Sequence, residues 1–152
     1  MKRQIKKAFC ILLFLILSAC FLCSCSKPVH YDYTGELDNV KSIEFINIPS
    51  LEDFYNDAPN YELIKSIPAD EWPDVLAKAA GLKYGHLFGD PPFLRAGEAL
   101  KVEFLEPVDG RIFILYSPDS FAEAKMVNGA VDIDSFAPHC IEGWDEFADT
   151  LR

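Results

Sequence analysis

The sequence predicts an α+β fold: an antiparallel sheet of four to five strands with two short helices packed on it. Three observations lead to this class. Apolar and polar residues alternate in several short segments, glycine-containing turns separate these segments, and two other segments have apolar residues at helical spacing. The connections in the second half are too short for crossover helices, so we expect antiparallel pairing. A length of 152 residues with 50% apolar content fits one domain plus a short extension.

The first expected strand covers 40–48, which is rich in β-branched and aromatic residues. Its apolar residues do not keep to one side. Ile43 and Phe45 fall on one face, whereas Ile46 and Ile48 fall on the other. The segment is therefore expected to be a strand buried on both faces, or a strand with a bulge.

The first expected helix follows a short expected strand at 61–67. Asp70 is placed to cap its amino end, and Pro73 falls in the first turn, where a missing N–H costs little. Gly81 is placed to end it. Between these residues lies an apolar stripe at helical spacing, which we expect to face the core: Trp72, Val75, Leu76, Ala79 and Ala80.

Two hairpins are expected in the second half of the chain. Segments 100–104 and 112–116 alternate as half-buried strands do, and Gly110 lies in the turn between them. The dipeptide Asn128-Gly129 is favoured in a two-residue type I′ turn, and it predicts a second hairpin. The chain then ends on an amphipathic helix whose apolar residues are spaced i, i+3, i+4 and i+7: Trp144, Phe147, Ala148 and Leu151.

The amino-terminal segment has the layout of a secretory signal. Residues 1–7 are basic, and an uncharged, mostly apolar run covers 8–23. A helix needs about 20 residues to cross a bilayer, so this run is short for a durable span. A cleaved signal is therefore favoured, and an uncleaved single anchor is the alternative.

The apolar run contains a more specific motif. Residues 17–20, with the sequence LSAC, resemble the lipobox of bacterial prolipoproteins, in which an aliphatic residue and two small residues precede a cysteine. The resemblance implies that a diacylglyceryl group is attached to the thiol of Cys20 and that a peptidase cuts just before it. A second match, LCSC at 22–25, has a cysteine in a small-residue position, and it makes Cys25 the alternative lipidation site.

These features divide the chain into three parts. The signal peptide is expected at 1–19, or at 1–24 if Cys25 is the modified residue. A polar, turn-forming, lipidated tether is expected at 20–39, followed by a single α+β domain at 40–152. This layout resembles that of short bacterial lipoproteins, which implies lipid anchoring at the extracytoplasmic face of the cell membrane.

The charge of the exported part excludes some partners. Four of the 14 basic residues and none of the 24 acidic residues lie in 1–19, so the remainder has a net charge of −14. Phosphate backbones are bound mainly by lysine and arginine, so we expect no nucleic-acid partner. Contact with the membrane is expected through the lipid anchor, and a basic or cationic partner suits this surface.

The sequence contains no linear motif for catalysis, a metal or a cofactor, so we predict no cofactor and assign no catalytic or metal-binding residue. His139 and Cys140 are adjacent, and neighbours in a strand or helix usually point to different sides, which argues against a thiolate–imidazole pair. Cys140 is expected to be a small buried apolar residue. Calcium at a non-linear carboxylate cluster is an alternative role for the acidic residues.

The segment 81–97 is the strongest candidate for an interaction surface, because it is long and rich in aromatic and turn residues. Its anchors are expected to be Tyr84, His86 and Phe93, in contact with an unknown protein, peptide or glycan partner. The alternative is that part of the segment is a further strand whose aromatic side chains cover the core.

These features favour a non-catalytic, lipid-anchored binding or interaction module. One alternative is a small cell-surface hydrolase using acidic residues, which needs a pocket with two carboxylates about 5 to 9 Å apart. Another is an inhibitor or accessory subunit, which exposes a contiguous apolar patch.

Overall fold

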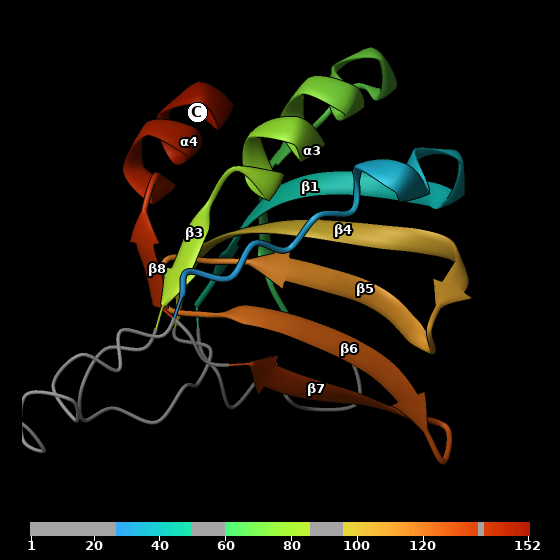
Figure 1. The fold of residues 1–152 in the computed structure, drawn as a ribbon. Coiled ribbons are helices and arrows are strands. Elements are labelled where there is room, and N and C mark those ends of the chain that lie inside the picture. Colours follow the sequence, from blue (N-terminus) through green and yellow to red (C-terminus); the bar gives the residue numbers. More distant parts are fainter. Residues whose placement is uncertain (1–26, 50–59, 86–95, 137–138) are drawn as a thin grey trace, which may run out of the picture.

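The structure is a computed structural model that describes residues 27–49, 60–85, 96–136 and 139–152. A six-stranded sheet carries two short α-helices on one face, and a small two-stranded sheet lies beside it (Figure 1). The α+β class and the antiparallel pairing are confirmed. The expected number of four to five strands was too low, since the main sheet has six strands and the small sheet adds two, of which β8 has four residues and shows no period.

The main sheet has the strand order β2-β1-β4-β5-β6-β7, and all neighbouring strands pair antiparallel. Its strands are β1 (Val40–Ile48), β2 (Glu62–Ser66), β4 (Gly97–Val108), β5 (Arg111–Tyr116), β6 (Phe121–Val127) and β7 (Ala130–Phe136). The small sheet pairs β3 (Lys83–Gly85) with β8 (His139–Glu142). The helices are η1 (Thr34–Asn39), η2 (Ala69–Glu71), α3 (Trp72–Ala80) and α4 (Trp144–Leu151).

Strand β1 has apolar side chains buried on both faces of the sheet, as its sequence predicted. Ile43 and Phe45 belong to the larger core cluster, which also contains the buried residues of α3 and α4. Ile46 and Ile48 belong to a second cluster, with buried residues of β4, β5, β6 and β7. The sheet is therefore buried on the face away from the helices as well as under them.

The two hairpins are closed by two-residue turns. Asp109 and Gly110 have φ values of 49° and 82°, and Asn128 and Gly129 have values of 53° and 83°. Two consecutive positive φ angles are what a type I′ turn requires. The hairpin predicted from Asn128-Gly129 is confirmed, and the first hairpin uses the same kind of turn.

Helix α3 begins with Pro73 in its first turn and ends before Gly81, as expected. Asp70 does not cap it. The residue lies in the 3-10 turn η2, and α3 starts after Glu71 without a side-chain capping hydrogen bond. The start of the helix is tied to the sheet instead, because Trp72 Nε1 donates to the carbonyl of Ile67 at 2.9 Å.

The folded domain begins earlier than we expected. Val29 and Tyr84 exchange two backbone hydrogen bonds, of 2.9 and 3.1 Å, so Val29 extends the small sheet at β3. Tyr31 then stacks on Phe121, with ring centroids 3.8 Å apart and planes within 7° of parallel. The segment from 29 to 39 is therefore part of the domain and not of a tether. Its turn-forming composition concealed aromatic residues that pack on the core.

Candidate binding site

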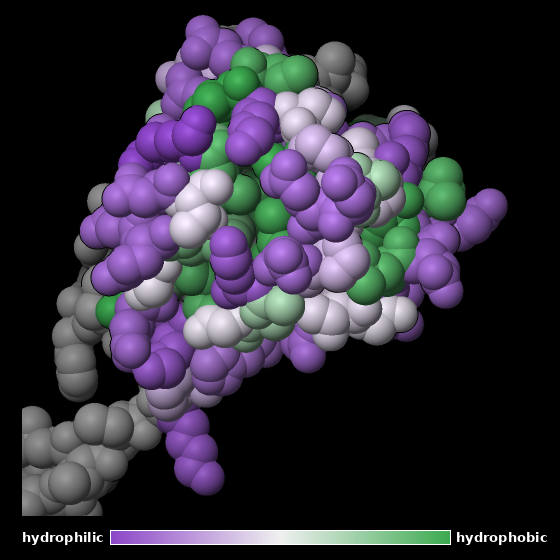
Figure 2. Space-filling view, turned by 90° about the horizontal axis from the view of Figure 1, so that it is seen from above, coloured by the Kyte–Doolittle hydropathy of each residue, from purple (hydrophilic) through white to green (hydrophobic). Residues whose placement is uncertain are grey.

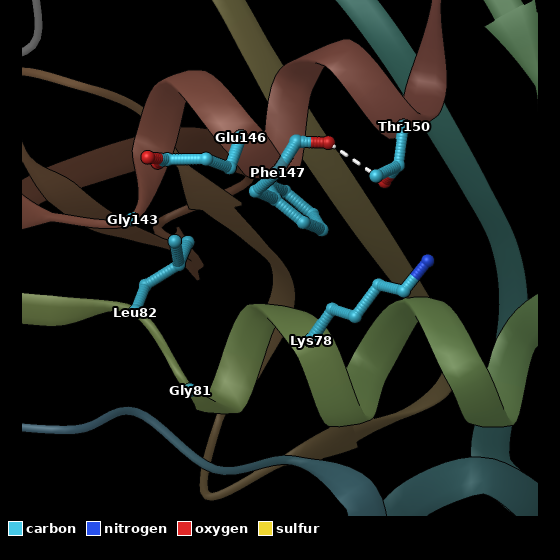
Figure 3. A pocket seen from close by; sticks show the side chains of 7 residues that line it. All are labelled: Lys78, Gly81, Leu82, Gly143, Glu146, Phe147 and Thr150. Carbon is cyan, nitrogen blue, oxygen red and sulfur yellow. Dashed lines mark hydrogen bonds between the residues drawn. The ribbon is translucent and has the colours of Figure 1, made fainter.

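A pocket of about 300 Å³ lies between α3 and α4. On the side of the molecule that carries the helices, the surface is mostly hydrophilic, with hydrophobic atoms visible in a hollow near its centre (Figure 2). The close-up shows side chains from both helices around the pocket (Figure 3). The lining residues come from α3 and the segment after it, and from α4 and the glycine before it: Lys78, Gly81, Leu82, Gly143, Glu146, Phe147 and Thr150.

Helical periodicity explains why this pocket has an apolar floor and a polar rim. In each helix the residues of the apolar stripe are buried, so their neighbours point outward. Leu82 and Phe147, 2% and 4% exposed, form the floor. Lys78 and Glu146 are exposed, and their charged groups point to opposite ends of the pocket (Figure 3). Thr150 donates its hydroxyl to the carbonyl of Phe147 at 2.8 Å.

The pocket does not have the composition that carboxylate-based hydrolysis requires. Glu146 is the one carboxylate among its lining residues, whereas glycoside cleavage uses two. A general acid also needs a raised pKa.

Two carboxyl groups outside the pocket have lowered pKa values instead. Hydrogen bonds from Thr34 lower the pKa of Asp32. Burial raises the pKa of Glu103, but hydrogen bonds from lysines outweigh this effect and lower it.

The predicted contact residues do not form a surface in the described part of the chain. Tyr84 is fully buried, and its hydroxyl donates to the carbonyl of Ser117 at 3.2 Å. It is a core residue, as expected under the alternative in which part of 81–97 forms a strand. His86 and Phe93 lie outside the described residues, as do both candidate lipidation sites, Cys20 and Cys25.

His139 and Cys140 are neighbours in β8. Burial raises the pKa of the Cys140 thiol, which favours the uncharged form at neutral pH. Its Sγ atom lies 3.5 Å from the carbonyl of Glu142, and the side chain packs against the larger core cluster. His139 Nδ1 lies 3.8 Å from a carboxylate oxygen of Asp119. An activated nucleophilic thiol has a lowered pKa, so the raised pKa of Cys140 argues against a nucleophilic role.

Lys101 forms a polar cluster that the sequence did not reveal. Apolar and polar residues alternate in β4, and this pattern predicts that the Lys101 side chain faces solvent. The residue is nevertheless only 6% exposed. Its ammonium group donates to Glu103 at 2.8 Å, to the Tyr61 hydroxyl at 3.1 Å and to Glu44 at 3.3 Å. It also lies 5.5 Å from the centre of the Phe113 ring. Apolar residues on both faces of β1 and β5 were the available signal that this side of the sheet is buried.

A second polar cluster lies on the helix-covered side of the sheet. Glu123 is 5% exposed, and one carboxylate oxygen is 2.6 Å from Nε of Arg111. Tyr33 donates its hydroxyl to the same oxygen at 3.2 Å. Burial raises the pKa of the Tyr33 phenol, and the charge of Glu123 raises it further. This cluster ties the 29–39 segment to β5 and β6, so its role is structural.

Large apolar side chains that are exposed occur on several strands rather than on one. Leu63 and Ile64 lie on β2, at one edge of the main sheet, whereas Met126 and Val127 lie near the turn that follows β6. This distribution does not favour the single apolar patch of an inhibitor or accessory subunit.

Two features are absent from the described residues. No group of three or more His, Cys, Asp or Glu side chains among them is arranged to hold a metal ion. No helix in these same stretches is long and apolar enough to cross a membrane.

Comparison with known proteins returned no match: no family model, curated protein or solved structure matches this chain.

Proposed function

We propose that this chain is a lipid-anchored protein of the extracytoplasmic face of a bacterial cell membrane, and that its domain is a non-catalytic binding module. The observation that carries the proposal is the LSAC sequence at 17–20, which lies within the apolar run that follows a basic segment. In prolipoproteins this arrangement directs lipid to the cysteine, here Cys20.

The lipid supplies the membrane affinity that the rest of the chain lacks. Residues 20–152 carry a net charge of −14, which anionic headgroups repel. A single myristoyl chain binds only marginally, whereas two chains anchor stably, at about 0.8 kcal/mol per buried CH₂. A diacylglyceryl group meets this requirement without any membrane-spanning helix.

Cys20 is the preferred attachment site, and Cys25 is the alternative. The residues before Cys20 follow the aliphatic-small-small pattern, whereas Cys23 breaks the pattern before Cys25. In favour of Cys25, a polar segment begins at Ser26, while Cys20 leaves Phe21 next to the lipid. We prefer Cys20 because the residues before it match the lipobox pattern fully.

Acylation is tested by growing cells that express the full chain with an alkyne-bearing fatty acid and then separating membranes. We expect the wild type and Cys25→Ala to be labelled and membrane-bound, and Cys20→Ala to lose the label. Loss of label in Cys25→Ala instead moves the site to Cys25. An unlabelled wild type contradicts the proposal.

For the binding role, the pocket between α3 and α4 favours a peptide or protein segment. Its volume of about 300 Å³ lies at the lower end of the range for ligand pockets and accommodates one large apolar side chain. Lys78 and Glu146, at opposite ends, can pair with polar groups on either side of that side chain. A glycan is less suited, because the Phe147 ring is too buried to offer a stacking face.

The binding role is tested with a random peptide library displayed on phage and selected against the lipidated full chain in vesicles. We expect the selected peptides to share one large apolar residue. Thr150→Arg places a long side chain at the rim and should weaken their binding by about tenfold or more. Ala77→Arg puts the same side chain on an exposed position of α3 that does not line the pocket and should leave binding unchanged. Equal effects of the two variants, or no selected peptide, contradict this role.

A further inference from the structure

We propose that the lipid anchor holds one particular side of the domain against the membrane: the small-sheet side, made of Val29, β3 and β8. The two hairpin turns then point away from the membrane. This inference rests on the proposed lipidation and extends it to the orientation of the domain.

The first step is the point at which the chain joins the domain. Val29 exchanges two backbone hydrogen bonds with Tyr84, and Tyr84 pairs in turn with Cys140. Val29 therefore lies at the outer edge of the small sheet. The chain that leads from the lipid enters the domain on this side, at the left of Figure 1, while the hairpin turns lie at the right.

The second step is the short length of chain between the lipid and this point. Val29 is nine residues from Cys20 and four residues from Cys25. An extended chain spans about 3.4 Å per residue, so Val29 is at most about 30 Å, or about 14 Å, from the acylated cysteine. A flexible chain of these lengths has a typical span of only about 16 or 11 Å.

The domain is large compared with the span of this tether. A domain the length of residues 29–152 has a radius of gyration of about 14 Å, which corresponds to a diameter of about 35 Å. Strand β6 alone, with seven residues, runs about 23 Å from Phe121 toward the second hairpin turn. If the hairpin turns touched the membrane, Val29 would be about 23 Å or more away, the length of β6. The four-residue tether cannot span this distance, and the nine-residue tether spans it only when strongly extended, beyond its typical span of about 16 Å. The short tether therefore disfavours that orientation.

The fourth step is the chemistry of the small-sheet side. Val29 and Ile141 are exposed apolar residues, at 44% and 47%. Lys27 is exposed and Lys83 is partly exposed, and lysines with apolar neighbours suit the boundary between headgroups and acyl chains. Lys83 is paired with Glu142 at 2.7 Å, so it adds little net charge. The tether sets the orientation, and these side chains are compatible with it.

The orientation is tested with the lipidated full chain in phosphatidylethanolamine–phosphatidylglycerol vesicles that contain a lipid with a nitroxide headgroup. A dye is placed through a clickable amino acid either at Ile141, on the small-sheet side, or at Leu105, which is 61% exposed on β4 near the first hairpin turn. We expect the nitroxide to quench the Ile141 dye at least about threefold more strongly, since a tether of typical span keeps Leu105 farther from the headgroups than Ile141.

Flotation of the vesicles separates the two proposals. A chain that does not float with the vesicles contradicts the lipid anchor itself. A chain that floats but shows equal quenching at the two positions contradicts the orientation and leaves the anchor intact. Inserting a twenty-residue Gly-Ser linker between Ser26 and Lys27 lengthens the tether and should remove the difference in quenching. A difference that persists with the long linker overturns the argument from tether length.

Discussion

Lys101 shows that a buried charge can stand at a position which a simple alternating pattern assigns to solvent. Burial lowers its pKa, but hydrogen bonds with Glu103 and Tyr61 outweigh this effect, and the net shift is upward. The ammonium group is therefore charged at neutral pH. Its carboxylate partners, Glu44 and Glu103, depend on it because they are themselves partly buried, with 21% and 28% of their side chains exposed.

We expect Lys101→Met to lower the free energy of unfolding by about 2 kcal/mol, because it leaves two partly buried carboxylates without their shared cation. Lys41→Met is the control. Lys41 also contacts Glu103, but its side chain is 56% exposed, so its loss should cost no more than about 0.5 kcal/mol. Urea denaturation at pH 7 measures both values. Equal effects would mean that Lys101 is not the centre of the cluster.

The same cluster predicts a dependence of stability on pH. Burial raises the pKa of Glu103, but hydrogen bonds from Lys101 and Lys41 outweigh it and bring the pKa below the ordinary 4.5. A carboxyl group with a lowered folded-state pKa stabilises the fold above its unfolded pKa, and this contribution is lost as pH falls through the folded value. We expect the urea midpoint of the wild type to fall between pH 6 and pH 3 more steeply than that of Glu103→Gln. Glu106→Gln, at an exposed position of β4, should behave like the wild type. Parallel curves for all three chains argue against this role of Glu103.

At the scale of the elements, periodicity and turn chemistry predicted most of the main sheet. Asn128-Gly129 located one hairpin because few residue pairs tolerate two positive φ angles. A strand within 81–97 was expected only as an alternative, and its pairing with β8 was not predicted, since the four residues of β8 show no period. The pocket between the helices was also out of reach of the sequence, because it depends on how α3 and α4 pack and not on either helix alone.

Gly143 joins the small sheet to α4, and its conformation sets the position of that helix. Its φ is +101°, and a Cβ atom there would lie 3.3 Å from Cδ2 of Leu82. We expect Gly143→Ala to destabilise the domain by about 1–2 kcal/mol, since an L-residue is strained at this φ. Gly35→Ala, where a Cβ meets nothing within 4 Å, should cost much less. Thermal unfolding of the two variants compares these costs. A Gly143→Ala variant as stable as Gly35→Ala would contradict the requirement for glycine at position 143.

At the scale of the whole molecule, the main correction concerns where the domain begins. Composition placed the segment before Val40 in the tether, since it contains Pro28, Gly35 and several polar residues. The stacking of Tyr31 on Phe121 is a contact between residues ninety positions apart, and nothing local to the segment encodes it. The earlier start of the domain shortens the expected tether, and the proposed orientation of the domain depends on this shorter length.

We expect Tyr31→Ala to destabilise the domain by about 2 kcal/mol, because it removes a stacked ring at the edge of the core. His30→Ala, at an exposed position one residue earlier, should have an effect below about 0.5 kcal/mol. Urea denaturation of the two variants compares them. If both variants are as stable as the wild type, then 29–39 does not belong to the folded domain.

The most direct test of the account is the intact mass of the chain extracted from membranes with detergent. The account predicts a chain that begins at Cys20 and carries the added mass of a diacylglyceryl group. A mass five residues smaller would move the start to Cys25 and keep the anchor. A chain recovered from the cytosol with Met1 in place and without acyl groups would contradict the proposed anchor and the orientation that depends on it.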